Sequence, residues 1–552
     1  MRLIRVAVAA VLLGVAAAPP ASAQISADTA QLIDRVFAPL NRADAPGCSI
    51  GIDRDGLPLY RRGYGMASLE SRAPMTEGSI VESGSVAKQF TAGAIVYLAL
   101  NGKLDLDDPV RKYIPELPDY GAPVTIRMLL HHTSGVRDMW TLFVLAGQPP
   151  GTVLYSMDQA LRMIYRQRAL NFPPNSEFLY SNSGFLLLAE IVHRVSGVPL
   201  ARFSRDVFFR PLGMDHTQWR DDWNRVVPGR TTAYSPAPGH GFQVDMPFMS
   251  VYGAGGLLTT VGDLLRWNEQ LTHPKVGGQA WADTLQHVGR LANGRAIDYG
   301  FGLFVTRYRG EREVSHGGAT GGYRTFLARW PDRKLSMAVL CNVANAGPDN
   351  LAHQVADVFI GARPAAASTG AETAGMGQDD PSSYVGRYRA PETEDLLTIA
   401  MHDGRLEANL GARLPLAAAG KDRFRASAAG VDLVFRRGPD GKVSGLTVIA
   451  IDRDTTVFER IAPPPSSAAE LAAFAGTYYS DELDVTYRVG VRDTALVLQV
   501  ADQPEVDLSR TARDSFARAG GMALRFSRAK NNRPDGFLLF AGRVKNLHFV
   551  RR

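Results

Sequence analysis

The sequence predicts an α+β protein in which an antiparallel sheet packs against a helical lobe and is followed by two small antiparallel β-barrel domains. Strand-like segments at residues 46–66 and 301–342 enclose a region whose apolar residues mostly follow a helical period. The last third of the chain consists of short alternating segments separated by Gly and Asp turns, which is typical of antiparallel barrels or sandwiches. Because 552 residues exceed one ordinary domain, several units are expected.

Residues 1–23 are interpreted as a signal peptide. Arg2 and Arg5 precede an apolar stretch, and Ala21-Ser22-Ala23 has the small residues of a signal-peptidase site. The apolar stretch is shorter than the roughly 20 residues that a membrane-spanning helix needs, and no later stretch would serve. We therefore expect a mature chain that begins after position 23, that has no stable membrane span, and that is periplasmic or secreted.

Residues 24–362 form the predicted main domain. A hairpin at 46–66 opens it, because the polar turn Asp53-Arg54-Asp55-Gly56 separates two apolar strands. Helical periodicity follows, and strands return before the domain ends. The predicted helices are 88–100, 157–170, 183–196 and 261–271, and the predicted later strands are 301–308, 323–330 and 335–342.

A linker and two copies of one small domain complete the predicted organisation. Residues 363–381 are rich in Ala, Gly, Thr and Ser and lack apolar periodicity, as in a linker. The β-barrel domains are expected at 382–462 and 468–552, joined by a stretch rich in Pro and Ser. The repeat is inferred because similar residues recur 90 positions apart: Tyr384, Gly386 and Tyr388 correspond to Phe474, Gly476 and Tyr478.

Charge and cysteine content set further bounds. Without Arg2 and Arg5 the formal net charge falls from +6 to +4, and the remaining arginines are dispersed, so no nucleic-acid partner is expected. Cys48 and Cys341 each lie in an apolar strand-like segment. An oxidising compartment would permit a bridge between them, but two buried free thiols are the slightly favoured expectation.

Ser85 and Lys88 are the most informative pair in the chain. They stand where the turn Glu82-Ser83-Gly84 gives way to a largely apolar predicted helix. A serine hydroxyl needs a base to become nucleophilic, and a lysine one helical turn later can be that base. The spacing alone is weak, because Ser527 and Lys530 repeat it before a turn sequence that cannot continue as a buried helix. A helix cap is an equal alternative for Ser85.

Two further polar segments lie at element boundaries. Tyr180 and Asn182 stand at the start of a predicted helix, where a tyrosine can share a proton with a lysine and an asparagine amide can orient lysine and substrate. The segment His316-Gly317-Gly318-Ala319 lies between predicted strands, where glycines admit the close approach of a substrate. The amides of Ser85 and Ala319 would then form an oxyanion hole. Alone, either segment would be an ordinary loop or turn.

The adjacent histidines His131 and His132 are interpreted as structural. Neighbouring side chains point in different directions on most backbones, and no Cys or carboxylate set completes a metal site around them. No metal and no other cofactor is therefore expected.

The ordered set of Ser85-x-x-Lys88, Tyr180-x-Asn182 and His316-Gly317-Gly318 resembles the penicillin-recognising serine hydrolases, in particular their class C β-lactamase-like branch. The stretches at 129–135 and 253–260 are similar to the same family, and the resemblance covers about residues 28–360. It implies a β-lactamase/transpeptidase-like fold with the active site in a cleft between sheet and helical lobe. It also implies catalytic roles for Ser85, Lys88 and Tyr180 and substrate-binding roles for Asn182, His316, Gly317, Gly318 and Ala319.

The two C-terminal β-domains, of a lipocalin-like kind, extend this resemblance to the D-aminopeptidase type, whose barrels contribute a loop to the active-site entrance. The His-Gly-Gly triplet is similar to that type as well, whereas β-lactamases usually begin the triplet with lysine. A neutral His316 suits a substrate carboxylate less well than a lysine does. A substrate ammonium group would need a carboxylate in the pocket, for which Asp535 is the hypothesis.

The sequence therefore predicts an exported serine hydrolase that acts through an acyl-enzyme on a small peptide, amide or ester. Release of N-terminal D-residues from short peptides is the first expectation. Carboxylesterase, β-lactamase and DD-carboxypeptidase activities stay open, as does a catalytically silent protein that binds peptidoglycan or peptide. The natural substrate, the stereochemical preference and a homodimeric state also stay open.

Overall fold

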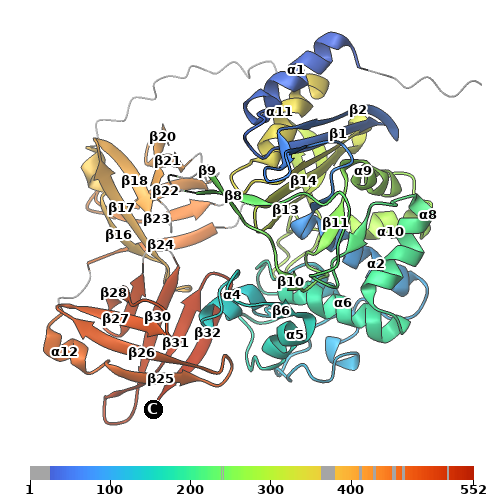
Figure 1. Ribbon diagram of the computed structural model, residues 1–552. Coiled ribbons are helices and arrows are strands. Elements are labelled where there is room, and N and C mark those ends of the chain that lie inside the picture. The colour runs from blue at the N-terminus through green and yellow to red at the C-terminus, as the bar shows by residue number, and fades with distance from the viewer. Residues whose placement is uncertain are drawn as a thin grey trace, which may run out of the picture.

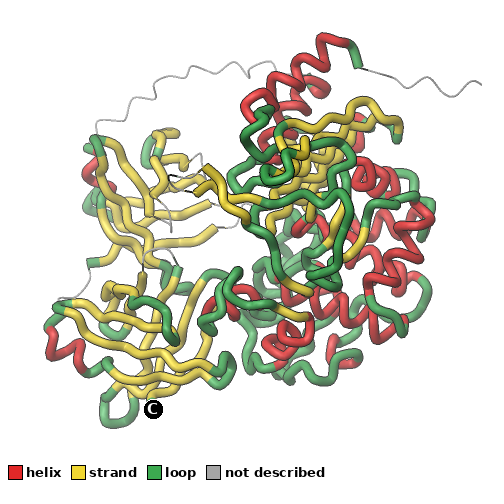
Figure 2. Tube along the Cα trace, viewed as in Figure 1, coloured by secondary structure: helices red, strands yellow, loops and turns green. Residues whose placement is uncertain are grey.

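The computed structural model describes residues 25–237, 239, 241–361, 380–409, 413–426, 431–449, 455–462, 466–518 and 521–552. The predicted signal peptide at 1–23 and most of the predicted linker at 363–381 lie outside these residues. A unit of helices and sheet lies beside two β units, which are stacked one above the other in Figures 1 and 2. The α+β class and the two antiparallel barrels are confirmed.

The central sheet of the first unit is antiparallel and pairs the beginning of the unit with its end. Strand β1 lies between β2 and β15, so the predicted N-terminal hairpin adds to the strands that close the unit. The strand predicted at 301–308 begins only at Phe304, because the amide of Gly300 bonds to the carbonyl of Leu303 in a turn. In sheet order the strands are β12 (Phe304–Tyr308), β13 (Glu311–Thr320), β14 (Tyr323–Trp330), β15 (Leu335–Cys341), β1 (Cys48–Arg54) and β2 (Leu57–Tyr64).

Helices cover both faces of this sheet. Helices α1 (Ala27–Phe37) and α11 (Pro348–Ile360) pack together on one face, and α9 (Val261–Gln270) packs against β1 and β15 on the other. All residues of β1 except the last are therefore buried. This explains why β1 has a near-continuous apolar sequence rather than an alternating one.

The helical lobe is built around α2 (Lys88–Leu100), which begins and ends where the apolar run predicts. Its residues are buried on all sides, as expected for a helix that is apolar all round. The helix predicted at 157–170 ends at Tyr165 instead, because Gln167 turns to the second barrel and its amide donates to the Glu482 carbonyl. The other helices are α3 (Ile126–Leu130), α4 (Met139–Leu145), α5 (Met157–Tyr165), α6 (Asn182–Ser196), α7 (Leu200–Ser204), α8 (Arg210–Leu212) and α10 (Gly278–Leu285).

Within the described part of the chain, no single helix is long and apolar enough to cross a membrane. Two helical segments bent by 76° to each other, Asn182–Ser196 and Leu200–Leu212, pass the test of length and composition only when they are taken together.

Short strands connect these helices to the sheet. The short strands are β3 (Met66–Ser68), β4 (Ala73–Pro74), β5 (Val81–Glu82), β6 (Tyr155–Ser156), β7 (Gln218–Trp219), β8 (Tyr234–Ala237), β9 (Gly241–Val244), β10 (Met249–Ser250) and β11 (Leu257–Thr259).

Cys48 and Cys341 form a disulfide, so the expectation of free thiols is wrong. The two residues are direct partners in the β1–β15 ladder, and their Cα atoms are 4.0 Å apart. They are separated by 293 positions in the chain, so only the strand pairing brings them together. The bond ties the N-terminal hairpin to the last strand of the sheet.

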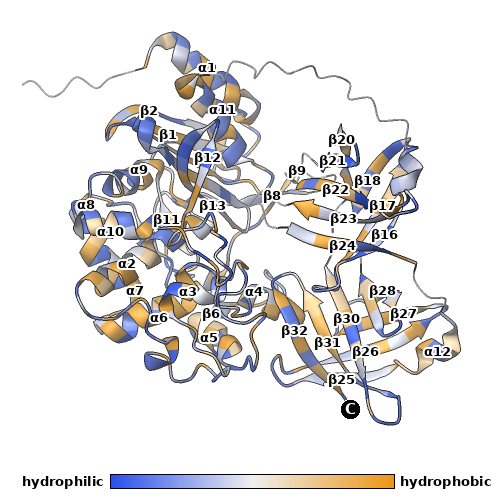
Figure 3. Cartoon of the chain, turned by 180° about the vertical axis from the view of Figure 1, so that it is seen from behind, coloured by the Kyte–Doolittle hydropathy of each residue, from blue (hydrophilic) through white to orange (hydrophobic). Residues whose placement is uncertain are grey.

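The two C-terminal units are both antiparallel and barrel-like, and the predicted repeat is visible in their hydrogen bonds. The Tyr388 hydroxyl donates to the Tyr384 carbonyl at 2.7 Å, and the Tyr478 hydroxyl donates to the Phe474 carbonyl at 2.7 Å. Strands such as β26 (Val485–Arg492) alternate buried and more exposed residues, and Figure 3 shows the mixed hydropathy of the barrel strands.

The second barrel is closed, and the first is nearly so. In the first, a nine-stranded sheet ends in β19 and β20, which follow each other in the chain across Leu416. Its strands are β16 (Gly386–Arg389), β17 (Leu396–His402), β18 (Arg405–Asn409), β19 (Arg413–Pro415), β20 (Ala417–Gly420), β21 (Arg423–Ala426), β22 (Val431–Arg437), β23 (Val443–Ile449) and β24 (Thr455–Ile461). The second barrel follows α12 (Ala468–Ala472) and has β25 (Gly476–Ser480), β26, β27 (Ala495–Val500), β28 (Val506–Ala512), β29 (Ser515–Arg518), β30 (Met522–Arg528), β31 (Pro534–Ala541) and β32 (Val544–Arg551).

Candidate active site

Ser85 lies in a tight turn, η2 (Gly84–Ala87), that runs directly into α2. Lys88 is the first residue of α2, and its side-chain nitrogen Nζ is hydrogen-bonded to Ser85 Oγ at 3.1 Å. The same nitrogen donates to Asn182 Oδ1 at 2.9 Å and to the Ala254 carbonyl at 2.7 Å. The sequence pair is therefore joined in space, and Asn182 completes the cluster as the sequence predicts.

Two glycines bring the third predicted segment against the Ser85 turn. A Cβ atom at Gly318 would lie 2.0 Å from the Ser83 carbonyl oxygen, so only glycine allows this approach. A Cβ atom at Gly84 would lie 2.5 Å from the amide nitrogen of Ala319, and Gly84 has φ of +51°. The Ala319 amide thus lies beside the turn that carries Ser85. Strand β12 pairs with β13 only as far as Ser315, which leaves room for the turn.

The Lys88 side chain is fully buried, and this determines its charge state. Burial lowers the pKa of Lys88 well below its usual value, and the Arg543 guanidinium lowers it further, while Asp138 opposes them. A lowered pKa enlarges the fraction of the amine that is neutral at any given pH. Lys88 can therefore accept a proton from Ser85.

Tyr180 closes the cluster on the other side. Its hydroxyl is buried and has no hydrogen-bond partner in the described part of the chain, and Lys88 Nζ lies 4.7 Å from the centroid of its ring. Burial raises the pKa of Tyr180, while the neighbouring Ser85 hydroxyl and the Arg543 guanidinium act in the opposite direction. The phenol is therefore protonated at neutral pH and can donate to a group that enters the site.

Asp138 holds Asn182 in place, and sequence reasoning missed it. The Asn182 backbone amide and side-chain nitrogen Nδ2 both donate to Asp138 Oδ2, at 2.7 and 2.8 Å. This pair of bonds turns Asn182 Oδ1 towards Lys88. The other oxygen of Asp138 caps the start of α4. The sequence could therefore have indicated Asp138 as a helix cap, but its contact with Asn182 forms only in the folded protein.

His316 is buried in the sheet behind Tyr180, and its partner is Tyr299. His316 Nδ1 lies 2.6 Å from the Gly317 carbonyl and carries the proton, so Nε2 accepts from the Tyr299 hydroxyl at 3.0 Å. Burial, reinforced by the charge of Lys88, lowers the pKa of His316 to about 3, so the ring is neutral. The hydroxyl that His316 contacts is therefore that of Tyr299 and not that of Tyr180.

His131 and His132 are packed in the interior. The His131 Nδ1 atom lies 3.2 Å from the Tyr299 carbonyl, and burial lowers the pKa of His131 to about 4. His132 Nδ1 accepts from the Ser181 amide at 3.1 Å, and its ring stacks obliquely on Tyr180. Within the described residues, no group of His, Cys, Asp and Glu side chains has the makings of a metal site.

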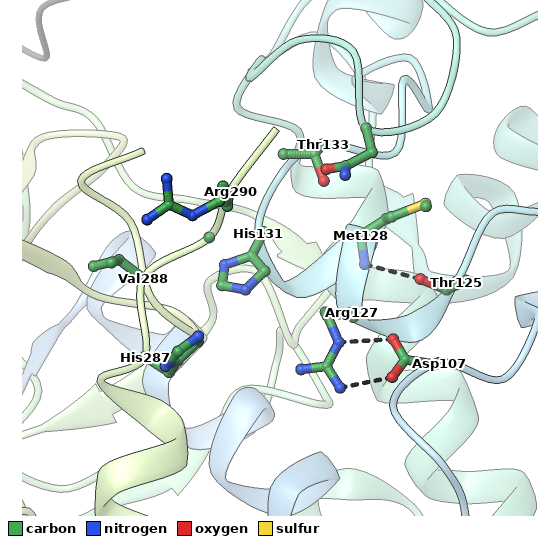
Figure 4. A pocket seen from close by; sticks show the side chains of 11 residues that line it. Asp107, Thr125, Arg127, Met128, His131, Thr133, His287, Val288 and Arg290 are labelled. Carbon is green, nitrogen blue, oxygen red and sulfur yellow. Dashed lines mark hydrogen bonds and ion pairs between the residues drawn. The ribbon is translucent and has the colours of Figure 1, made fainter. Parts of the chain in front are cut away.

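A separate cavity of about 580 Å³ lies behind His131 (Figure 4). Arg127 crosses it in a paired contact with Asp107, and both hydrogen bonds are drawn in the figure. None of the predicted site residues lines this cavity. It is therefore a neighbour of the Lys88 cluster rather than part of it.

The second barrel reaches the cluster through the turn between β31 and β32. Arg543, at the tip of this turn, lies with its guanidinium carbon 4.8 Å from the centroid of the Tyr180 ring. Asp535 lies at the opposite end of β31 and accepts a hydrogen bond from Ser527, so the hypothesis that Asp535 faces the pocket is wrong. Ser527 is a strand residue of β30, unlike Ser85.

The chain belongs to the Beta-lactamase family, whose model matches residues 33–360. It is 28% identical over 448 residues to D-aminopeptidase of Gluconobacter oxydans, covering 80% of this chain and 81% of that one. It is 30% identical over 303 residues to penicillin-binding protein 4* of Bacillus subtilis, covering 51% and 65%. These relatives support a hydrolase of this family.

Solved structures agree on the fold. A penicillin-binding protein homologue from Pyrococcus abyssi superposes with a TM-score of 0.57 and 22% identity, covering 78% of this chain and 99% of that one. D-amino acid amidase from Ochrobactrum anthropi superposes with a TM-score of 0.52 and 20% identity, covering 60% and 99%. At these identities the likeness establishes the fold alone.

Proposed function

We propose that the protein is a serine hydrolase that cleaves an amide or ester through an acyl-enzyme on Ser85. The observation that carries this proposal is the 3.1 Å contact between Ser85 Oγ and the fully buried, pKa-depressed amine of Lys88. A neutral amine at hydrogen-bond distance is the base that a serine hydroxyl requires.

The chemistry follows from these positions. Lys88 takes the Ser85 proton as Oγ attacks the carbonyl carbon, and the carbonyl oxygen becomes an oxyanion. The amides of Ser85 and Ala319 donate to that oxyanion. As the tetrahedral species collapses, the leaving amine or alkoxide receives a proton from the Lys88 ammonium by way of the Tyr180 hydroxyl. Water then attacks the acyl carbon while Lys88 takes its proton by way of Tyr180, and as the bond between the acyl carbon and Ser85 Oγ breaks, that proton passes to Oγ and restores the serine.

Short peptides with an N-terminal D-residue are the first substrate class in this proposal. The similarity to D-aminopeptidase over about 80% of both chains supports this choice. Carboxylester, β-lactam and DD-carboxypeptide hydrolysis are the alternatives, since they need the same cluster. The N-terminal sequence supports export, so the proposed site of action is periplasmic or extracellular.

Labelling with a fluorophosphonate and turnover of p-nitrophenyl esters test the hydrolase. Ser85→Ala is expected to abolish both, whereas Ser527→Ala, which changes the second serine with this spacing, is expected to leave both unchanged. A catalytically silent binding protein would give neither labelling nor turnover. D-Ala p-nitroanilide is expected to react faster than its L-isomer and faster than nitrocefin, and the reverse order would contradict the D-peptide preference.

A further inference from the structure

The second barrel presents one cation to the catalytic cluster at the tip of a tight hairpin (Figure 1, where β32 begins beside α4). Ala541 pairs with Val544, so the turn between them consists of Gly542 and Arg543. Gly542 has φ of +53°, which glycine adopts without strain. A two-residue turn has few alternative conformations, so the base of the Arg543 side chain is held in a defined place.

The hairpin is clamped onto the catalytic domain from both sides. The Asn171 side chain donates to the Arg543 carbonyl at 3.0 Å and accepts from the Lys545 amide at 2.7 Å. The buried Arg137 guanidinium donates to the carbonyls of Lys545 and Asn546, at 3.1 and 2.7 Å. The position of the tip is thus fixed by the catalytic domain itself.

The N–H groups of the Arg543 guanidinium, by contrast, have no hydrogen-bond acceptor among the described residues. It packs over the Tyr180 ring, and its closest carboxylate oxygen is Asp138 Oδ2 at 4.0 Å, beyond hydrogen-bond distance. Its side chain is 45% exposed, and no hydrogen bond from its guanidinium to another described residue is present. A guanidinium offers five donors in a planar fork that matches a carboxylate.

The carboxylates near this cation are already engaged. Asp138 accepts from Asn182 and caps α4, Glu482 pairs with Arg137 at 2.7 Å, and Glu177 pairs with Lys545 at 2.7 Å. These three carboxylates therefore have hydrogen-bonded partners, whereas the Arg543 guanidinium has only the 4.0 Å ion pair with Asp138 and no hydrogen-bonded acceptor among the described residues. This arrangement attracts a negative group on the substrate.

We propose that Arg543 is a specificity-determining residue that binds a carboxylate of the substrate while Ser85 attacks the scissile carbonyl. The inference rests on the proposed hydrolase function and adds the charge of the substrate to it. For a short D-peptide the carboxylate is either the free C-terminus of the leaving group or an acidic group on the acyl part. Both present the same chemistry to Arg543.

Two matched pairs of substrates test this. D-Ala-D-Ala is compared with D-Ala-D-Ala amide for the leaving-group side, and D-Glu p-nitroanilide with D-Gln p-nitroanilide for the acyl side, so that every substrate keeps a free N-terminal D-residue. At least one pair is expected to show a kcat/KM ratio of about 10 or more in favour of the carboxylate, because charge-assisted paired hydrogen bonds are the strong ones. The pair that shows it identifies the side.

Variants of the full chain test whether Arg543 causes this kcat/KM ratio. Arg543→Met is expected to lower it at least tenfold and Arg543→Lys only in part, since lysine keeps the charge and loses the fork. Lys545→Met is the matched control, because it removes a cation of the same hairpin that Glu177 already neutralises, and the ratio is expected to persist. Ratios are taken on the pH plateau of each variant.

The outcomes separate the two proposals. Ratios near 1 in both pairs, or a ratio that survives Arg543→Met, would overturn the role of Arg543 while the hydrolase stands. A collapse of the ratio in Lys545→Met to the same degree would assign the effect to the position of the hairpin and would also overturn it. Absence of fluorophosphonate labelling of wild-type Ser85 would instead remove the hydrolase itself.

Discussion

The ion pair between Arg137 and Glu482 joins the catalytic domain to the second barrel and gives a sharp test of the structure. The Arg137 side chain is 0% exposed and that of Glu482 is 4% exposed, with 2.7 Å between Nη1 and Oε2. Glu482 Oε2 also accepts from the Arg168 amide at 2.7 Å. Glu482→Leu removes the acceptor of both hydrogen bonds and leaves a buried cation without its counter-charge.

The expected cost follows from that burial. Two unit charges 2.7 Å apart attract by about 6 kcal/mol at an effective dielectric constant near 20. Arg137 keeps its bonds to two carbonyls and to Gln167, so part of the loss is compensated. Removing one partner of a buried pair costs about 3–5 kcal/mol. We expect the melting temperature to fall by roughly 6–20 °C, with easier proteolysis between the domains.

The neighbouring position supplies the control. Asp481 pairs with Arg168 at 2.9 Å, but these side chains are 55% and 73% exposed, and an exposed pair contributes at most about 1 kcal/mol. Asp481→Asn is therefore expected to shift the melting temperature by a few degrees at most. Thermal melting and limited proteolysis of both variants provide the measurement. Equal, small shifts would refute the interpretation that this buried pair holds the barrel in place.

Two further predictions concern the cluster itself. Because Lys88 acts as a neutral base, kcat/KM for p-nitrophenyl esters is expected to fall as the pH drops through a pKa well below that of ordinary lysine, and a midpoint near the usual lysine value would contradict this. Gly318→Ala is expected to slow fluorophosphonate labelling of Ser85 at least tenfold, since its Cβ would meet the Ser83 carbonyl. Gly317→Ala, where the nearest atom is 3.8 Å away, is expected to keep the labelling rate within a few fold. Equal rates in the two variants would show that the backbone contact does not support the turn.

Local patterns were sufficient for the elements that hold the chemistry. The helix that begins at Lys88 and the strand β14 have their predicted limits, because the apolar runs that mark them are properties of neighbouring residues. The contact between Ser85 and Lys88 is also local, since residues three apart share a helical face.

The partners that complete the site were beyond local patterns. Asn182 and Asp138 are 44 positions apart, and His316 meets Tyr299 across a turn of the sheet region. The cation at the cluster, Arg543, comes from another domain. The neighbouring sequence of these residues does not indicate which side chains they contact, because the distances between such remote positions are set only when the chain folds.

The sequence by itself determined the fold class, the duplicated barrels and the residues of the Ser85, Tyr180 and His316 segments, since these depend on periodicity, spacing and composition. The tertiary structure decided the Cys48–Cys341 bond, through strand pairing. It also decided the electrostatics of the cluster. The fold buries Lys88 and brings the Arg543 guanidinium close to it, and both effects lower the pKa of Lys88. Protonation depends on surroundings in three dimensions, which spacing along a chain does not specify.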